Sequence, residues 1–321
     1  MRGRSFLGTI AGDGRPLLLA VSGSLVFAGG FAIFLAASGE FLPHDVAFLG
    51  MTPEALCRIA GCRVVDFMLH DRAAWGGALV AIGVMYAWLV LFPLGRGEAW
   101  AWWVLVVSGV IGFLTFLGYF GYGYLDTWHG LGTLLLVPVF AYGAARTRTL
   151  VARTKPAIPP LQRDSRSLGR IVLIMGAAGS AFAGGVILTI GVTDIFVPED
   201  IEFIGRTADD LRALDPQLVP LIAHDRAGFG GAVLVAGLVG CACLVFSEVT
   251  RDLWEALAVA GAVSLSAATS VHLFVGYTDF GHLVPPLLGI ASLVVGLSLA
   301  AAPERRHSAV HAGRRIANLD P

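Results

Sequence analysis

The chain has 321 residues, of which 56% are hydrophobic and only 14% are charged, and its 22 basic and 23 acidic residues give a formal net charge of −1. A soluble domain contains about 25% charged residues, so this composition excludes a protein whose whole surface faces water. The balanced charge gives no reason to expect a nucleic acid as partner, and the sequence carries no nucleic-acid-binding motif. The expected partners are membrane lipids.

Apolar stretches of about 20 residues, the length of a helix that crosses a bilayer core, recur along the chain. They are continuously apolar and do not alternate, which favours helices over the strands of a barrel. The sequence therefore predicts an all-α integral membrane protein with eight transmembrane helices. In chain order the predicted spans are Leu17–Ala37, Ala73–Pro93, Ala99–Tyr119, Thr127–Ala145, Ile171–Val192, Ala227–Phe246, Trp254–Phe274 and Gly281–Ala302.

The basic residues are distributed unevenly between the two sides of the predicted bundle. An even number of spans puts both termini on one side, and most of the 22 Lys and Arg residues fall on that side. Basic residues collect on the cytoplasmic side of membrane proteins. Trp100 and Trp254 begin the third and seventh spans there, as interfacial aromatic residues do. The sequence therefore predicts a multi-pass protein of the cell membrane with both termini in the cytoplasm.

The second half of the chain repeats motifs of the first half in the same order and at nearly constant spacing. The pairs are FLPHDVAFLG at 41–50 with FVPEDIEFIG at 196–205, HDRAAWGG at 70–77 with HDRAGFGG at 224–231, and GYLDTWH at 123–129 with GYTDFGH at 276–282. This pattern predicts a tandem duplication of a four-helix unit. Because each unit has an even number of spans, the units should be parallel and related by a pseudo-two-fold axis along the membrane normal.

The repeat divides the chain into four predicted segments. They are a first four-helix membrane repeat at 1–145, a basic cytoplasmic linker at 146–170, a second four-helix repeat at 171–302 and a cytoplasmic tail at 303–321. The linker contains several prolines and no apolar period, which is typical of a loop.

The repeated motifs place histidines and aspartates at the non-cytoplasmic ends of the spans. Asp126 and His129 are spaced i, i+3, as are Asp279 and His282, so each pair can lie on one helix face. Imidazole and carboxylate groups suit zinc, iron, manganese or copper, and equally suit proton transfer. Haem is an alternative ligand. The candidate metal ligands are His70, His129, His224, His282, Asp45, Asp126, Asp200 and Asp279.

The second half supplies the candidate catalytic residues. His272 lies inside the seventh span, where an ionisable side chain is costly and therefore a functional candidate; the alternative is a hydrogen bond to a helix carbonyl. The candidate catalytic set is His224, Asp225, Asp279, His282 and His272.

Several of these residues also have a structural interpretation. Asp71 and Asp225 could cap the second and sixth spans, as Asp126 and Asp279 could cap the fourth and eighth. Arg72 and Arg226 are expected to extend to the lipid head groups or to pair with a carboxylate, and Thr52 and Thr207 to cap short outer helices. The glycine pairs at 29–30, 76–77, 184–185 and 230–231 should permit close helix approach. Cys57 and Cys62 either form a local disulfide or stay reduced.

Three classes of function remain after this reading. The preferred one is a metal-binding membrane enzyme whose outer histidines and aspartates converge beside an apolar pocket and act on a lipid-like substrate, such as an isoprenoid, a quinone or an acyl chain. The alternatives are a carrier for a small or apolar solute and a non-catalytic subunit or assembly factor. A polar route through the membrane is not evident, because His272 is the only ionisable residue placed well inside a predicted span.

Overall fold

The computed structural model describes residues 12–124, 127–151 and 157–301. Within these ranges all regular structure is helical and no strand occurs. Eight of the described helices are long and apolar enough to cross a membrane, which indicates a multi-pass membrane protein. They are α2 (Arg15–Ala37), α5 (Cys62–Leu91), α6 (Ala99–Leu117), α7 (Thr127–Thr147), α8 (Ser165–Val192), α11 (Leu218–Phe246), α12 (Arg251–Val275) and α13 (Phe280–Ala300).

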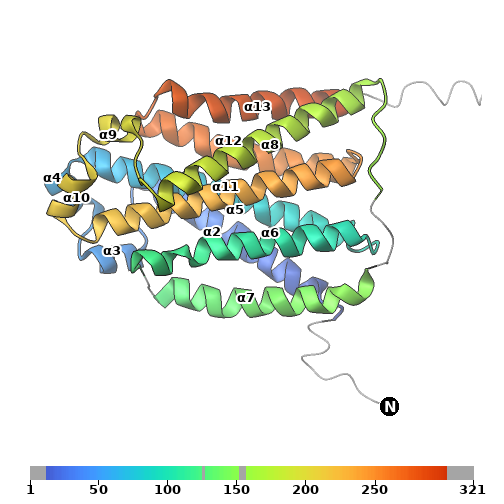
Figure 1. Cartoon of the computed structure of the whole chain (residues 1–321), viewed down its shortest axis with the longest axis horizontal. Helices are drawn as coiled ribbons and strands as arrows, with labels where there is room; N and C mark the ends of the chain where they lie inside the picture. The colour runs from blue at the N-terminus through green and yellow to red at the C-terminus, as the bar shows by residue number, and fades with distance from the viewer. Residues whose placement is uncertain (1–11, 125–126, 152–156, 302–321) are drawn as a thin grey trace, which may run out of the picture.

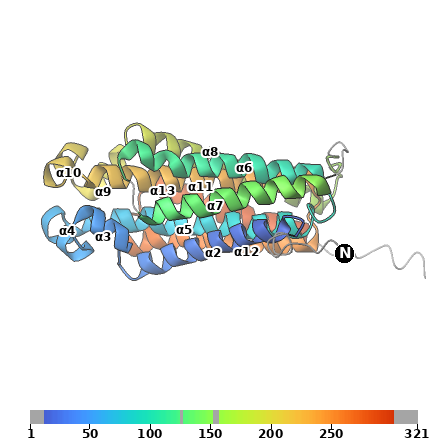
Figure 2. The ribbon, with the colours of Figure 1, turned by 90° about the horizontal axis from the view of Figure 1, so that it is seen from below.

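The long helices run side by side, and the shorter helices collect at one end of the bundle (Figures 1 and 2). We call this the cap end. Its short helices are α3 (Pro43–Leu49), α4 (Pro53–Ala60), η1 (Gly118–Tyr122), α9 (Pro198–Ile204) and α10 (Ala208–Leu214). The start of α2 and the end of α13 lie at the opposite end (Figure 1), where the short helix η2 (Arg148–Leu150) follows α7.

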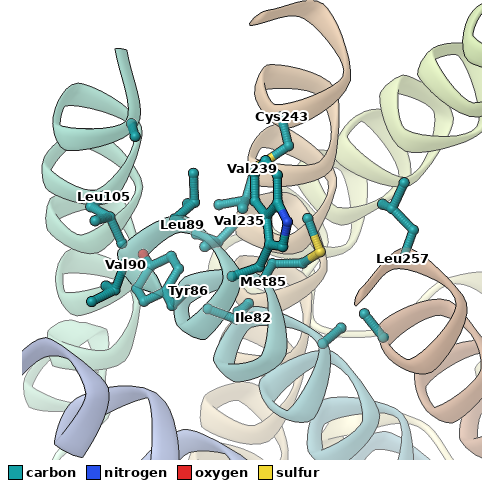
Figure 3. Close-up of a cluster of buried hydrophobic side chains, with 14 of the residues drawn as sticks. Ile82, Met85, Tyr86, Leu89, Val90, Leu105, Val235, Val239, Cys243 and Leu257 are labelled. Carbon is teal, nitrogen blue, oxygen red and sulfur yellow. The ribbon is translucent and has the colours of Figure 1, made fainter. Parts of the chain in front are cut away.

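Helices α5 and α11 form the centre of the bundle and are its most buried spans. Helix α5 packs against α2, α12 and α11, whereas α11 packs against α8, α5 and α6. Figure 3 shows part of the core between them, where Tyr86 of α5, Leu105 of α6 and Val235 of α11 are buried together. The residues at the middle of the bundle are thus mostly apolar, and the buried Asp, Arg and His side chains of α5 and α11 lie toward the cap end.

Glycines allow the closest helix contacts. A side chain on Gly29 of α2 would overlap the backbone of Gly76 on α5, and one on Gly184 of α8 would overlap the backbone of α11. These positions agree with the expected role of the glycine pairs. Their neighbours Gly30 and Gly185 differ, because no atom lies within 4 Å of the position that a side-chain carbon would take.

The helices that carry the HDR motifs begin much earlier than the sequence predicts. Helix α5 begins at Cys62 and α11 at Leu218, rather than at 73 and 227. Asp71 and Asp225 are therefore interior helix residues, and the interpretation of these two as caps is wrong. The apolar residues of the extra turns, such as Val64, Phe67 and Leu221, are buried in a second hydrophobic cluster with residues of the short helices of the cap end.

Other local expectations at the cap end are confirmed. Thr52 Oγ1 accepts from the backbone N–H of Ala55, and Thr207 Oγ1 from that of Asp210, as N-caps do. Asp279 caps α13 by accepting from the N–H groups of the next turn. Cys57 and Cys62 form a disulfide that joins the end of α4 to the start of α5. Asp126, the other predicted cap, lies outside the described residues.

Candidate functional site

A buried charged group, which we call the Asp45 cluster, lies where α3 meets α5 and α11. Arg72 Nη1 lies 2.8 Å from Asp45 Oδ2, and Arg72 Nε donates to Asp225 Oδ2 at 3.0 Å. His224 Nδ1 is 3.1 Å from Asp225 Oδ1. The Tyr124 hydroxyl donates to Asp45 Oδ1. Helices from both halves of the sequence therefore close one network of hydrogen bonds and ion pairs.

The Asp45 cluster is almost entirely shielded from solvent. Arg72 is 4% exposed and Asp45 is 1% exposed. Charges in such surroundings must be paired, and here two carboxylates face one guanidinium. The ring of Phe41 lies 4.9 Å from the Arg72 guanidinium carbon, in a cation–π contact. His44 Nε2 lies 3.6 Å from Asp45 Oδ1 at the edge of the network.

A second charged group, the Asp200 cluster, lies where α9 meets α11 and α13. Arg226 Nη1 lies 2.8 Å from Asp200 Oδ2, and the Tyr277 hydroxyl donates to Asp200 Oδ1 at 2.7 Å. His282 Nε2 lies 2.9 Å from the same hydroxyl, and its Nδ1 lies 3.2 Å from Asp279 Oδ1. The network therefore runs from a fully buried aspartate to an aspartate that is partly exposed.

The environment of the Asp200 cluster fixes the protonation of its residues outside the spans. Burial acts to raise the pKa of Asp200, but the contact with His282 and the charge of Arg226 outweigh it and hold the pKa below its usual range. The contact with His282 also lowers the pKa of Asp279. Burial and the Asp200 carboxylate raise the pKa of Tyr277, so the phenol stays protonated and can donate.

A histidine pair links α5 to α12 beside the Asp200 cluster. His272 Nδ1 lies 2.6 Å from the carbonyl oxygen of Ala268, and because a carbonyl only accepts, this nitrogen carries the hydrogen. A neutral His272 then presents the lone pair of Nε2, which lies 3.0 Å from His70 Nε2. His70 must therefore donate through Nε2.

The other face of His70 meets a carboxyl group. His70 Nδ1 lies 3.0 Å from Asp71 Oδ1. The pair is either imidazolium and carboxylate or neutral imidazole and carboxylic acid, since His70 Nε2 already holds a hydrogen. In both cases Asp71, His70 and His272 together carry no net charge. One proton can move between Asp71 and His70 without changing that net charge.

The two clusters are connected through the helix pair α5 and α11. Arg72 of α5 contacts Asp225 of α11, and Arg226 of α11 interacts electrostatically with Asp71 of α5. Each HDR motif therefore provides an arginine to its own cluster and an aspartate to the other one.

An apolar cavity of about 670 Å³ adjoins the Asp45 cluster. Its walls come from α2, α5, α6, α7 and α11, and its polar lining includes Asp45, Arg72, His224 and Asp225. Phe27 and Phe31 of α2 line the cavity and are also largely exposed. The cavity thus has exposed apolar residues in one part of its lining and buried polar residues in another.

The predicted metal ligands do not assemble into a metal site within the described part of the chain. No group of three or more His, Cys, Asp or Glu side chains there is placed to hold a metal ion. His224 pairs with Asp225, His70 with His272, and His282 with the Asp200 cluster. The preferred partners of Asp45 and Asp200 are arginine and tyrosine. Asp126 and the side chain of His129 lie outside the described residues.

Sequence reasoning missed the tyrosines and undervalued the arginines. Tyr124 and Tyr277 each donate to the central aspartate of a cluster. Their recurrence in the two GYxD motifs was a usable signal. Arg72 and Arg226 pair with carboxylates, which was one of the two expected arrangements, and they do so deep in the protein rather than at its edge.

Comparisons of the chain with protein-family models, with curated proteins and with solved structures gave no match.

Proposed function

We propose that this protein binds a lipid-like amphiphile in the cavity beside the Asp45 cluster and exchanges a proton with its head group through His224 and Asp225. The main observation in support is the cavity, whose apolar wall ends at the buried polar residues of the Asp45 cluster. Pockets for small molecules typically enclose roughly 300–1,000 Å³ and have mostly apolar walls with a few placed polar groups. A molecule with one polar end and an apolar tail matches that layout.

The access route supports a ligand that arrives from the membrane. The cavity reaches the bundle surface beside Phe27 and Phe31, which are lipid-facing side chains. Its polar end lies toward the cap end, close to one edge of the spans. An amphiphile lying in the corresponding bilayer leaflet has its head at this depth and its tail along the helices, so it can enter without leaving the bilayer.

The pair His224 and Asp225 supports proton transfer at the head group. Asp225 accepts from His224 Nδ1 and thereby orients the imidazole ring that lines the cavity. Arg72 in turn holds Asp225. A base that is oriented by a carboxylate, which is itself held in place, is a recurring arrangement in general acid–base catalysis.

We also propose that the chain is a duplication of a four-helix unit. Asp45, Arg72 and Tyr124 make the same set of contacts as Asp200, Arg226 and Tyr277, and each set occupies corresponding motifs of the two halves. This correspondence supports two parallel four-helix units joined by the basic linker. The uneven distribution of basic residues supports cytoplasmic termini, with the cap end outside.

The test is to identify what the purified protein carries. Protein isolated in a mild detergent is extracted and its bound apolar molecules are identified by mass spectrometry. Gly112 of α6 lines the cavity, and a Cβ atom added there would lie 3.8 Å from Val235, its nearest neighbour. Gly112→Leu should therefore fill the cavity without a clash and lose the bound molecule. Gly185→Leu makes the same change on α8, outside the cavity and with nothing within 4 Å, and should retain it.

Two results would contradict the proposal. One is wild-type protein that carries no amphiphile after purification and gains none from added membrane extract. The other is equal retention by the two glycine variants. Chemistry is tested separately, because Asp225→Asn or His224→Gln should leave bound substrate unconverted. Conversion by these variants at the wild-type rate would contradict the role of the pair in proton transfer, and no conversion by the wild type would leave only a carrier.

A further inference from the structure

We propose that the amphiphile has an uncharged head that offers a carbonyl or hydroxyl oxygen to Arg72, and that phosphate heads are rejected. This inference rests on the proposed function and specifies the ligand of the same cavity. The inference is based on the buried Nη2 atom of Arg72, which has no hydrogen-bond partner among the residues that the structure describes, and on the balance of charges around it.

Arg72 has a donor left over at the polar end of the cavity. Its Nε donates to Asp225, and its Nη1 forms the ion pair with Asp45. Its Nη2 is buried and hydrogen-bonds no described residue. A buried donor without an acceptor is costly. Since Arg72 lines the cavity, an oxygen of the bound molecule is the acceptor that would complete it.

The guanidinium is held in a fixed position before any ligand arrives. Asp45 on α3 and Asp225 on α11 fix it from two sides, and the Phe41 ring stacks near its carbon at 4.9 Å. A donor that is already immobilised loses little freedom when it binds an oxygen. The site is therefore suited to selecting a ligand by the chemistry of one atom.

The charges around this donor disfavour an anion. Among the described residues that line the cavity, Arg72 is the one Lys or Arg, and it faces the carboxylates of Asp45 and Asp225. Two carboxylates and one guanidinium together leave a net negative charge there. A phosphate or carboxylate head would add like charge in a low-dielectric site, where repulsion is strong. An ammonium head is attracted by the two carboxylates, but it has no lone pair to accept from Arg72 Nη2 and its positive charge would lie beside the guanidinium. A neutral oxygen acceptor avoids both costs.

The experiment compares three ligands that share one tail. Farnesol, farnesyl phosphate and farnesylamine are titrated into delipidated full-length protein in detergent, and binding is followed by tryptophan fluorescence, because Trp75 lines the cavity. Farnesol should bind at least about tenfold more tightly than the phosphate or the amine. Equal or tighter binding of either charged ligand overturns the inference and leaves the proposed function standing. Binding of none of the three overturns both.

Two substitutions locate the effect. Arg72→Lys keeps the positive charge but removes the Nη2 donor, and should weaken farnesol binding about tenfold. Arg226→Lys makes the same change in the Asp200 cluster, away from the cavity, and should leave farnesol binding unchanged. Equal effects of the two variants overturn the inference. Should Arg72→Lys fail to fold, Asp225→Asn serves instead: removing one negative charge should reduce the discrimination against farnesyl phosphate, and unchanged discrimination overturns the inference.

Discussion

At the scale of single residues, the molecule depends on ion pairs that are closed to water. Asp200 is fully buried and faces Arg226 at 2.8 Å. The net contribution of such a pair is small because both charges are desolvated, yet removing one partner leaves the other buried and unpaired. The aspartates are therefore more sensitive to substitution than any surface carboxylate.

The first prediction concerns Asp200→Asn. We expect it to lower the free energy of unfolding by about 3 kcal/mol, because Arg226 then loses the carboxylate that it contacts and keeps only its electrostatic interaction with Asp71. Unfolding in detergent under rising SDS measures the change. Asp209→Asn is the matched control, since Asp209 pairs with Arg212 at the exposed surface, where ion pairs contribute little. A loss as small as that of Asp209→Asn would contradict the prediction.

The second prediction follows from the lowered pKa of Asp200. A carboxyl group whose pKa is lower in the folded than in the unfolded chain stabilises the fold above the ordinary pKa, near 4. That contribution is lost as the pH falls through the lower folded-state pKa. Between pH 7 and pH 3 the melting temperature of the wild type should therefore fall more than that of Asp200→Asn. Parallel decreases would show that Asp200 titrates normally.

The third prediction concerns the hydrogens of the histidine pair. His272 should be protonated at Nδ1, and His70 at Nε2, because of the acceptors that they face. Nitrogen-15 NMR of histidine-labelled protein distinguishes these forms, with His70→Ala and His272→Ala used to assign the signals. An unprotonated Nδ1 in His272 would mean that the contact with Ala268 is not a hydrogen bond.

At the scale of elements, the early starts of α5 and α11 could not be predicted from the local sequence pattern. The run of His70, Asp71 and Arg72 resembles a membrane boundary, because three ionisable side chains are costly inside a span. The helix nevertheless continues through them, since the charges are neutralised by residues on α3, α9 and the opposite central helix. Those partners are far away in sequence.

The fourth prediction tests the contact between α2 and α5. Gly29→Leu should destabilise the protein by about 1–3 kcal/mol, because its side chain would overlap the backbone of Gly76. Gly30→Leu, one residue along the same helix, has open space and should change stability little. SDS unfolding of both variants gives the comparison. If Gly30→Leu were the more damaging, the face that α2 presents to α5 would be assigned incorrectly.

At the scale of the whole molecule, the number of spans and their approximate positions could be predicted from hydropathy alone. The helix class is confirmed, as are the two short helices capped by Thr52 and Thr207. Which helices are neighbours, and where a cavity remains between them, could not be predicted. Both depend on side-chain packing between segments that no local pattern connects, such as Thr115 of α6 against Gly231 of α11.

The candidate site was predictable in its residue types and not in its chemistry. Among the described residues, His224 and His282 lie in two buried networks that also contain Asp45 and Asp200. Asp45 and Asp200 contact arginine and tyrosine side chains, because Arg72 and Arg226 are buried in the protein instead of lying at its surface. A sequence gives the residue but not the direction of a long side chain.

The bridge that Arg72 makes between Asp45 and Asp225 has a consequence for ancestry. One carboxylate comes from the first half of the chain and the other from the second. On the proposal of an internal duplication, a forerunner with a single four-helix unit could have supplied the second carboxylate only from another copy of itself. Such a forerunner would have been a parallel homodimer, and gene fusion would have allowed the two copies to diverge, so that one now adjoins a large cavity and the other a much smaller one.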